Sequence, residues 1–243
     1  MSLKTILNYS PNFTSKKRKL NQIKFIIFHY TGMKNELAAI KRLTDIQSEV
    51  SSHYLIKNNG DIITLVPDLY IAWHAGISSW KNYKSINKYS IGIEISNPGH
   101  EYSYKKFSKK QIKSILKLTT YLKKKYKIKS NFILGHSDIA PDRKKDPGEK
   151  FPWKYLSKYN VGNWHNLNEK KILKNRSQKV NKSDEAKFIK NLHKIGYTKN
   201  KFFNSRKYLK FLTTAFQRRF RQELINGIID QECLVISKNL IKS

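Results

Sequence analysis

The stretch FILGHSDIAPDRKKDPG, residues 132–148, places an apolar run directly before a loop that is dense in polar side chains. The run at 132–134 predicts a buried strand, and strand ends that open into Pro- and Gly-rich loops often carry functional side chains. His136 and one aspartate of this loop are candidates for two ligands of a metal ion. Three aspartates compete for that second place: Asp138, Asp142 and Asp146.

Two further segments have the pattern of buried strands. Residues 23–28 form an apolar run that ends just before His29, the candidate for a third ligand. In residues 90–95 three isoleucines alternate with other residues, so they share one face of a predicted strand. Glu94 then lies on the opposite face of that strand, isolated from the isoleucines.

Two helices are predicted among these strands. From Asn35 to about Glu49 an apolar residue recurs every third position, at Leu37, Ile40, Leu43 and Ile46. Ser108 stands at the N-cap position of a second helix that runs to about Lys127. With a hairpin at residues 54–66, turning at Asn58-Asn59-Gly60-Asp61, the pattern predicts an α/β fold with a mixed central sheet flanked by helices.

The composition changes after residue 165 and divides the chain into three parts. Residues 1–165 form the predicted α/β domain. Residues 166–182 are polar and charged, which is typical of a linker. Residues 183–243 predict a small three-helix domain, with helices at 184–193, about 205–220 and about 232–240.

The formal charge of +32 suggests an anionic partner. Of the 49 basic residues 41 are lysine, whereas specific base contacts favour arginine. We find no helix-turn-helix, zinc-finger or RNA-recognition signature, so we expect no specific nucleic-acid binding. The C-terminal aromatics predict a helical core instead: Phe202, Phe203, Phe211 and Phe216.

Cysteine content and hydropathy bear on the compartment. The single cysteine, Cys233, lies among apolar residues and predicts a buried, inert thiol. No apolar stretch reaches the roughly 18–20 residues of a transmembrane helix, so no transmembrane segment is expected. The N-terminus lacks the apolar core of a secretory signal, which favours the cytoplasm.

The candidate ligands have a possible chemistry in common. A catalytic zinc ion takes about three protein ligands and leaves one position for water, a number that His29, His136 and Asp146 supply, with Asp138 or Asp142 as alternatives to Asp146. Glu94 is then a candidate general base, and Lys144 a candidate to stabilise an oxyanion. Such a site suits hydrolysis of an amide or an ester.

Five motifs between residues 20 and 165 occur in the order found in a known family: Ile27-Phe28-His29-Tyr30-Thr31, Ser52-His53-Tyr54, Ala72-Trp73-His74-Ala75-Gly76, Ser90-Ile91-Gly92-Ile93-Glu94-Ile95 and His136-Ser137-Asp138-Ile139-Ala140-Pro141. This region resembles the type 2 N-acetylmuramoyl-L-alanine amidases, of the peptidoglycan-recognition and phage-lysozyme superfamily. The C-terminal stretches Ala215–Phe220 and Asn226–Asp230 resemble a helical peptidoglycan-binding domain.

The resemblance implies roles for individual residues. It implies one Zn²⁺ ion with His29, His136 and Asp146 as ligands, Glu94 as catalytic base, and Lys144 assisting the tetrahedral intermediate. The implied substrate is peptidoglycan or muropeptides, cleaved between N-acetylmuramic acid, also in its anhydro form, and L-alanine. The positions that line the substrate cleft in the family correspond to Trp73, His74 and Trp80.

Departures from the family pattern leave the ligands intact. Asp142 stands where glycine is common, Lys145 where a small residue is common, and Ser52 where phage enzymes carry tyrosine, so the acid–base role falls on Glu94. Non-catalytic relatives have typically lost a ligand, so the filled positions favour an enzyme over a recognition protein. A wall-binding domain suggests the periplasm or cell envelope, against the cytoplasm suggested by the N-terminus.

Overall fold

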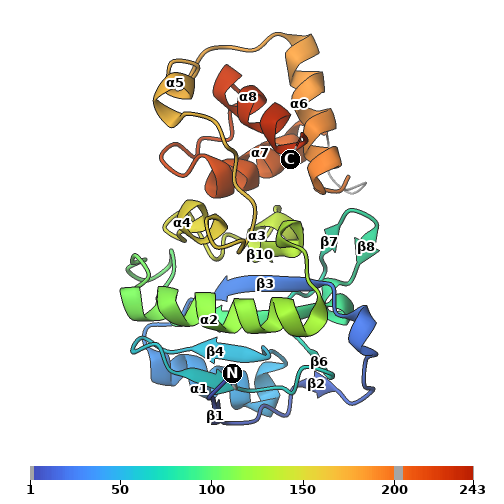
Figure 1. The fold of residues 1–243 in the computed structure, drawn as a ribbon, viewed down its shortest axis with the longest axis vertical. Coiled ribbons are helices and arrows are strands. Elements are labelled where there is room, and N and C mark those ends of the chain that lie inside the picture. Colours follow the sequence, from blue (N-terminus) through green and yellow to red (C-terminus); the bar gives the residue numbers. More distant parts are fainter. Residues whose placement is uncertain (1–2, 200–204, 243) are drawn as a thin grey trace.

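The predicted α/β class is confirmed by the computed structural model, which describes residues 3–199 and 205–242. Its centre is a six-stranded mixed sheet in the order β1-β5-β4-β9-β3-β10 (Figure 1). The β4–β5 pair is antiparallel, whereas β9 and β3 pair in parallel with each other and with their outer neighbours β4 and β10. The carboxyl ends of β9, β3 and β10 therefore meet at one edge of the sheet.

The strands of the described residues are β1 (Ile6–Leu7), β2 (Phe13–Thr14), β3 (Phe25–Tyr30), β4 (Tyr54–Ile56), β5 (Ile62–Thr64), β6 (Ile71–Ala72), β7 (Ser79–Trp80), β8 (Tyr83–Lys84), β9 (Ser90–Ile95) and β10 (Ile133–Gly135). The predicted hairpin is confirmed by the antiparallel β4–β5 pair. The strand predicted at 23–28 begins and ends two residues later, so His29 lies inside β3.

The helices are α1 (Glu36–Thr44), α2 (Lys109–Tyr126), α3 (His136–Ile139), α4 (Trp153–Ser157), α5 (Glu169–Leu173), α6 (Lys182–Ile195), α7 (Ser205–Phe220) and α8 (Gln231–Leu240). Short 3₁₀ helices lie at Leu20–Gln22, Ile46–Ser48, Ile86–Tyr89 and Ser130–Phe132. The predicted N-cap of α2 is confirmed, because the Ser108 hydroxyl accepts the Gln111 N–H at 3.2 Å and the Gln111 side chain accepts the Ser108 N–H at 2.9 Å.

One face of the sheet is covered by α2 (Figure 1). The alternation of β9 places Ile91, Ile93 and Ile95 in this core, where they join Ile115 and Leu122 of α2. Glu94 consequently projects from the opposite face, as predicted. Functional side chains on that second face are therefore kept apart from the α2 core.

The predicted apolar stripe of α1 is partly wrong. The helix ends at Thr44, and Leu37 and Ile46 are 76% and 63% exposed. A strict three-residue spacing drifts around a helix of 3.6 residues per turn. The helix buries Ala39 and Leu43 instead, four residues apart on one face.

The three predicted C-terminal helices are confirmed as α6, α7 and α8, and they pack against the rest of the molecule (Figure 1). Phe188, Leu212 and Phe216 belong to one buried cluster with Phe25 and Ile27 of β3. We call residues 182–242, as far as they are described, the helical unit. Its core is continuous with the second face of the sheet, and Phe211 packs against it, whereas Phe202 and Phe203 lie outside the described residues.

Residues 166–182, the segment predicted to be a linker, pack against the helical unit. They contain α5, whose Ile172 is 7% exposed and packs into the same cluster as the helical unit. Arg176 also pairs with Glu232 of α8, with Nε 2.7 Å from Oε2. The burial of Ile172 and the ion pairs of Arg176 with Glu232 and Glu223 thus hold a segment that is polar in composition.

Two further sequence predictions concern burial and hydropathy. Cys233 is fully buried, as expected. Among the described residues no helix is both long and apolar enough to cross a membrane.

Candidate metal centre and active site

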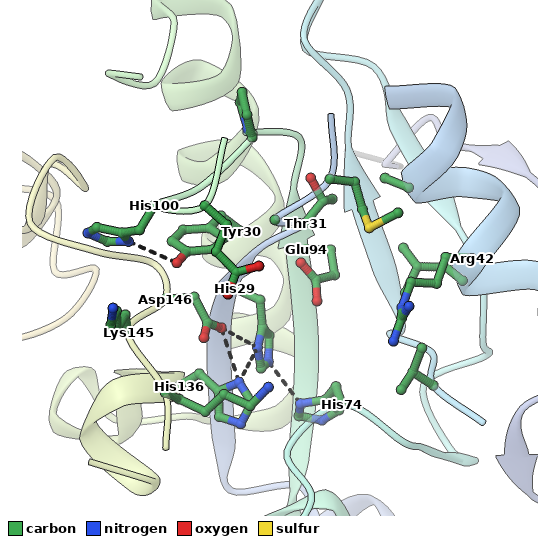
Figure 2. Close-up of a pocket in the computed structure, with 18 of the residues that line it drawn as sticks. His29, Tyr30, Thr31, Arg42, His74, Glu94, His100, His136, Lys145 and Asp146 are labelled. Carbon is green, nitrogen blue, oxygen red and sulfur yellow. Dashed lines mark hydrogen bonds and ion pairs between the residues drawn. The ribbon is translucent and has the colours of Figure 1, made fainter. Parts of the chain in front are cut away.

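Three predicted ligands meet at the carboxyl edge of the sheet (Figure 2). His29 lies near the end of β3, and His136 is the first residue of α3, directly after β10. Asp146 lies in the loop that follows α3. Because β3 and β10 are parallel neighbours, their ends bring the two histidines together across more than a hundred residues of chain.

The ligand atoms converge closely. His29 Nδ1 lies 3.0 Å from His136 Nδ1 and 2.9 Å from Asp146 Oδ2, and His136 Nδ1 lies 3.1 Å from the same oxygen. All three side chains are buried. Within the described part of the chain this is the one group of three or more histidine, cysteine, aspartate or glutamate side chains that converges as metal ligands do.

Hydrogen bonds on the far side of each ring orient the lone pairs. His136 Nε2 lies 3.2 Å from the Ala75 carbonyl, which only accepts, so this nitrogen carries the proton. His29 Nε2 lies 3.0 Å from His74 Nδ1. His74 Nε2 lies 3.0 Å from the Ser90 hydroxyl, which donates to the Ile86 carbonyl at 2.8 Å. This series of hydrogen bonds ends on a carbonyl, which only accepts. His74 Nε2 can therefore donate to the Ser90 hydroxyl, and His29 Nε2 can donate to His74 Nδ1. His29 Nδ1 is then left with a lone pair.

Protonation favours the same arrangement. Burial and the neighbouring His136 lower the pKa of His29 to about 4, despite the opposing effect of Asp146. Burial raises the pKa of Asp146, but His136 and His29 outweigh it and hold this pKa below its usual range. At neutral pH the site therefore offers the Asp146 carboxylate and a neutral His29 imidazole. Two nitrogens and one oxygen in this arrangement suit Zn²⁺, and the polar partners behind them are typical of metal-binding histidines.

Gly92 makes room for the ring behind His29. A Cβ at this position would lie 2.4 Å from His74 Cγ, closer than any side chain could approach. Gly92 lies on β9 directly beside Ile27 of β3, on the face from which His29 projects. A glycine is therefore required sterically at this position of the Ser90–Ile95 motif, because it leaves space for the His74 ring beside His29.

Glu94 occupies the strand next to His29. The two residues are register partners in the parallel β9–β3 pair, so they project from the same face of the sheet (Figure 2). Burial and the nearby Asp146 carboxylate raise the pKa of Glu94 well above its usual value, against the opposing effect of Lys144. Its Oε2 atom is buried without a hydrogen-bond partner. A carboxyl group of this kind is suited to take and return a proton.

A cavity of about 550 Å³ joins these groups. Its lining includes the three ligands, Glu94 and Lys144 together with Trp73, His74 and Arg42. Arg143 shapes the rim, because its guanidinium donates to the Ala75 carbonyl and, from Nη2 at 2.6 Å, to the Ile77 carbonyl. Sequence reasoning did not identify Arg42 or Arg143, since nothing in their local pattern distinguishes them from other surface cations.

Trp80 does not line this cavity, and its assignment to the substrate cleft is wrong. The side chain is 2% exposed and packs edge-on against Tyr197 of the helical unit, with ring centroids 4.8 Å apart. Gly196, at φ 144°, passes so close that a Cβ there would lie 2.2 Å from Trp80 Cε2. The local sequence resembles a cleft segment, but the helical unit covers it.

The rival carboxylates have other surroundings. Asp138 is 2% exposed and is held by Arg219, Tyr197 and the Gly135 N–H. Asp142 is not part of the convergent group. Ser52 is fully buried and donates to the Tyr54 carbonyl at 2.9 Å. The geometry thus favours Asp146 as the carboxylate of the site.

Comparison with known proteins agrees with this fold and site. Residues 19–149 match the family described as N-acetylmuramoyl-L-alanine amidase. The chain is 34% identical over 233 residues to the N-acetylmuramoyl-L-alanine amidase AmiD of Escherichia coli K12, covering 91% of this chain and 83% of the relative. The chain therefore belongs to the N-acetylmuramoyl-L-alanine amidase family and is an enzyme of that class, as predicted.

Two solved structures of substantial coverage share the fold. One is AmiD from E. coli in complex with anhydro-N-acetylmuramic acid-L-Ala-D-γ-Glu-L-Lys, with a TM-score of 0.80, 33% identity, and coverage of 91% of this chain and 89% of that one. The other is AmpDh3 from Pseudomonas aeruginosa in complex with anhydromuramic pentapeptide, with a TM-score of 0.79, 29% identity, and coverage of 94% of both chains.

Proposed function

We propose that this amidase is zinc-dependent and hydrolyses the amide bond between N-acetylmuramic acid, including its anhydro form, and the L-alanine of the stem peptide. The observation that carries the proposal is the convergence of His29, His136 and Asp146 beside Glu94 in one cavity. The muropeptide complexes of AmiD and AmpDh3 support the substrate class.

The three ligands would hold the zinc ion through His29 Nδ1, His136 Nδ1 and a carboxylate oxygen of Asp146. A zinc ion bound there would supply Lewis acidity toward water and the scissile carbonyl. The ring of His136 is oriented by its hydrogen bond to the Ala75 carbonyl, and the ring of His29 by its hydrogen bond to His74.

Glu94 would act as the general base and then as the general acid. Its carboxylate takes a proton from the attacking water as the carbon–oxygen bond forms. The same proton passes to the leaving nitrogen as the carbon–nitrogen bond breaks, giving a carboxylic acid and a free L-alanine amine. The raised pKa of Glu94, caused mainly by burial, suits both transfers.

Other residues of the cavity would assist this reaction. The Lys144 ammonium would offset negative charge on the carbonyl oxygen in the transition state. Trp73 and His74 would line the bound substrate, with Trp73 held by a hydrogen bond from its Nε1 to Thr14 Oγ1 at 3.1 Å. Polymer binding by the helical unit stays a prediction.

The test is cleavage of an anhydromuropeptide, followed by mass spectrometry of the released stem peptide. We expect cleavage by the zinc-loaded protein and none after chelation, with recovery on adding zinc. Glu94→Gln should lower kcat by about 10²- to 10⁴-fold. Glu169→Gln, at an exposed carboxylate paired with Lys154, should match the wild type.

Three outcomes would contradict the proposal. Cleavage that survives complete removal of zinc would overturn the role of the metal. Wild-type kcat in Glu94→Gln would overturn the role of that residue. A folded, zinc-loaded protein that releases no stem peptide would overturn the substrate.

A further inference from the structure

The helical unit touches the segment that carries the metal ligands. The loop after α6 lies against the β7–β8 hairpin, where the Lys81 N–H donates to the Gly196 carbonyl at 2.7 Å. Ser79 and Thr198 hydroxyls lie 2.5 Å apart across the same contact. Contacts between α3 and α7 bring the helical unit to the first turn after β10. His136, a proposed ligand, begins that turn.

Asp138 is the centre of this contact. It stands two residues after His136, and its Oδ2 accepts the Gly135 N–H at 2.8 Å. The same oxygen pairs with Arg219 Nη1, and Oδ1 accepts the Tyr197 hydroxyl at 2.8 Å. Arg219 and Tyr197 both come from the helical unit, so its side chains hold the carboxylate on two sides.

Arg219 also holds the strand that leads into the loop. Its Nη2 donates to the Ile133 carbonyl of β10 at 3.1 Å. Its guanidinium lies 4.1 Å from the centre of the Trp153 ring. The side chain of Arg219 is 4% exposed and that of Asp138 is 1% exposed, so water does not replace this ion pair. One guanidinium thus joins α7, the first residue of β10 and the first turn of α3.

The stretch Ala215–Phe220, which resembles part of a peptidoglycan-binding domain, contributes to this contact. In Ala215–Phe220, Phe216 and Phe220 are buried, and Gln217 closes a turn by accepting the Asn226 and Gly227 N–H groups at 3.0 and 2.8 Å. These side chains face inward. The residues of this stretch therefore pack inside the protein, and Arg219 among them contacts Asp138 and Ile133 beside His136.

We infer that Arg219 is a positioning residue that acts through Asp138 to hold His136 in its metal-binding orientation. This inference rests on the proposed function, because it assumes that His136 binds zinc. Without Arg219 the buried Asp138 carboxylate would lose the cation that pairs with it directly. The turn would shift to reach water, and His136 would move with it. Metal ligands need to be held within about 0.5 Å of productive geometry.

Zinc affinity of Arg219→Met, measured in competition with a chromophoric chelator, tests this inference. We expect it to be about tenfold weaker than that of the wild type, the lower end of what loss of a supporting contact costs. The cobalt-substituted protein gives a second readout, because its visible absorption reports ligand geometry and should change in band position or intensity. Circular dichroism and thermal melting identify the temperature at which each variant is folded.

The matched control is Arg221→Met. Arg221 is also a buried arginine, and it pairs with Asp230 inside the helical unit, away from the metal-binding segment. A general loss of stability would affect both variants, whereas only Arg219→Met should weaken zinc binding and alter the cobalt spectrum. Arg219→Lys keeps the charge but loses the second hydrogen bond, so its zinc affinity should be intermediate.

Tyr197→Phe keeps the inference testable if Arg219→Met does not fold. It removes only the hydroxyl that donates to Asp138, and we expect zinc binding to weaken in the same direction by a smaller factor. Wild-type affinity and an unchanged cobalt spectrum in folded Arg219→Met, or in Tyr197→Phe where that variant stands in, would overturn the inference alone. Failure of the wild-type protein to bind zinc would overturn the proposed function and the inference together.

Discussion

Two tryptophans that the sequence assigns to the same cleft should behave differently when truncated. Trp80 is 2% exposed beneath the helical unit, whereas Trp73 is 36% exposed and lines the cavity. Trp80→Ala should therefore reduce the stability of the protein without weakening substrate binding. Trp73→Ala should instead weaken substrate binding and have only a small effect on stability.

The magnitude for Trp80 follows from its surroundings. Its Nε1 has no hydrogen-bond partner, so truncation removes packing alone. A buried tryptophan replaced by alanine costs about 3–5 kcal/mol of unfolding free energy. For a chain of this size roughly 2–4 °C of melting temperature is lost per kcal/mol, so the expected decrease is roughly 6–20 °C.

Trp73 has less to lose in packing and more in binding. Its truncation removes a partly exposed ring and one hydrogen bond to Thr14, which costs about 1 kcal/mol of stability. Loss of a large aromatic contact in the cavity should raise KM about tenfold, equivalent to about 1.4 kcal/mol.

The assay combines thermal melting, followed by circular dichroism, with KM for a soluble anhydromuropeptide at a temperature where both variants are folded. Trp80→Phe is the control for size, since it keeps an aromatic ring and should recover most of the lost stability. A Trp80→Ala variant with wild-type melting temperature and raised KM would refute the assignment of Trp80 to the shared core.

Two further predictions concern buried groups away from the site. Burial raises the pKa of Asp68, but hydrogen bonds from Lys125, Tyr126 and Tyr54 outweigh it and hold the pKa below its usual value of 3.8. This pairing therefore stabilises the folded state above pH ~4, and the stabilisation is lost as the pH falls. The difference in unfolding free energy between wild type and Asp68→Asn, measured in urea melts, should shrink below pH ~4. A difference that stays constant with pH would argue against the pairing. Burial raises the pKa of the Cys233 thiol to about 12, so iodoacetamide should label it only in denaturant, and rapid labelling of the native protein would contradict its burial.

The strand positions of the candidate metal ligands and of Glu94 were largely predictable because they depend on local pattern. The alternation in residues 90–95 correctly separated Glu94 from three isoleucines that enter the α2 core. The apolar runs before His29 and His136 correctly placed both near the ends of strands. Local pattern left the choice of aspartate open among Asp138, Asp142 and Asp146.

What could not be predicted depends on residues far apart in the chain. Asp138 is occupied by Arg219, and no feature near Asp138 indicates that partner 81 residues away. Trp80 is similarly covered by Tyr197 of the helical unit. The packing of residues 166–182 was not evident from their composition, which averages over a segment, whereas one residue, Ile172, supplies the burial in α5.

The register of β3 with β9 has a consequence for how this enzyme can vary. His29 and Glu94 are opposed in a ladder of main-chain hydrogen bonds, which any pair of residues could form. The separation between the proposed metal ligand His29 and the proposed base Glu94 is thus set by the sheet and does not depend on the loops. Substitutions around the rim can then alter which substrates enter the cavity while the separation between His29 and Glu94 stays the same. In this molecule, evolution can therefore change which substrates bind without changing the geometry of the reacting groups.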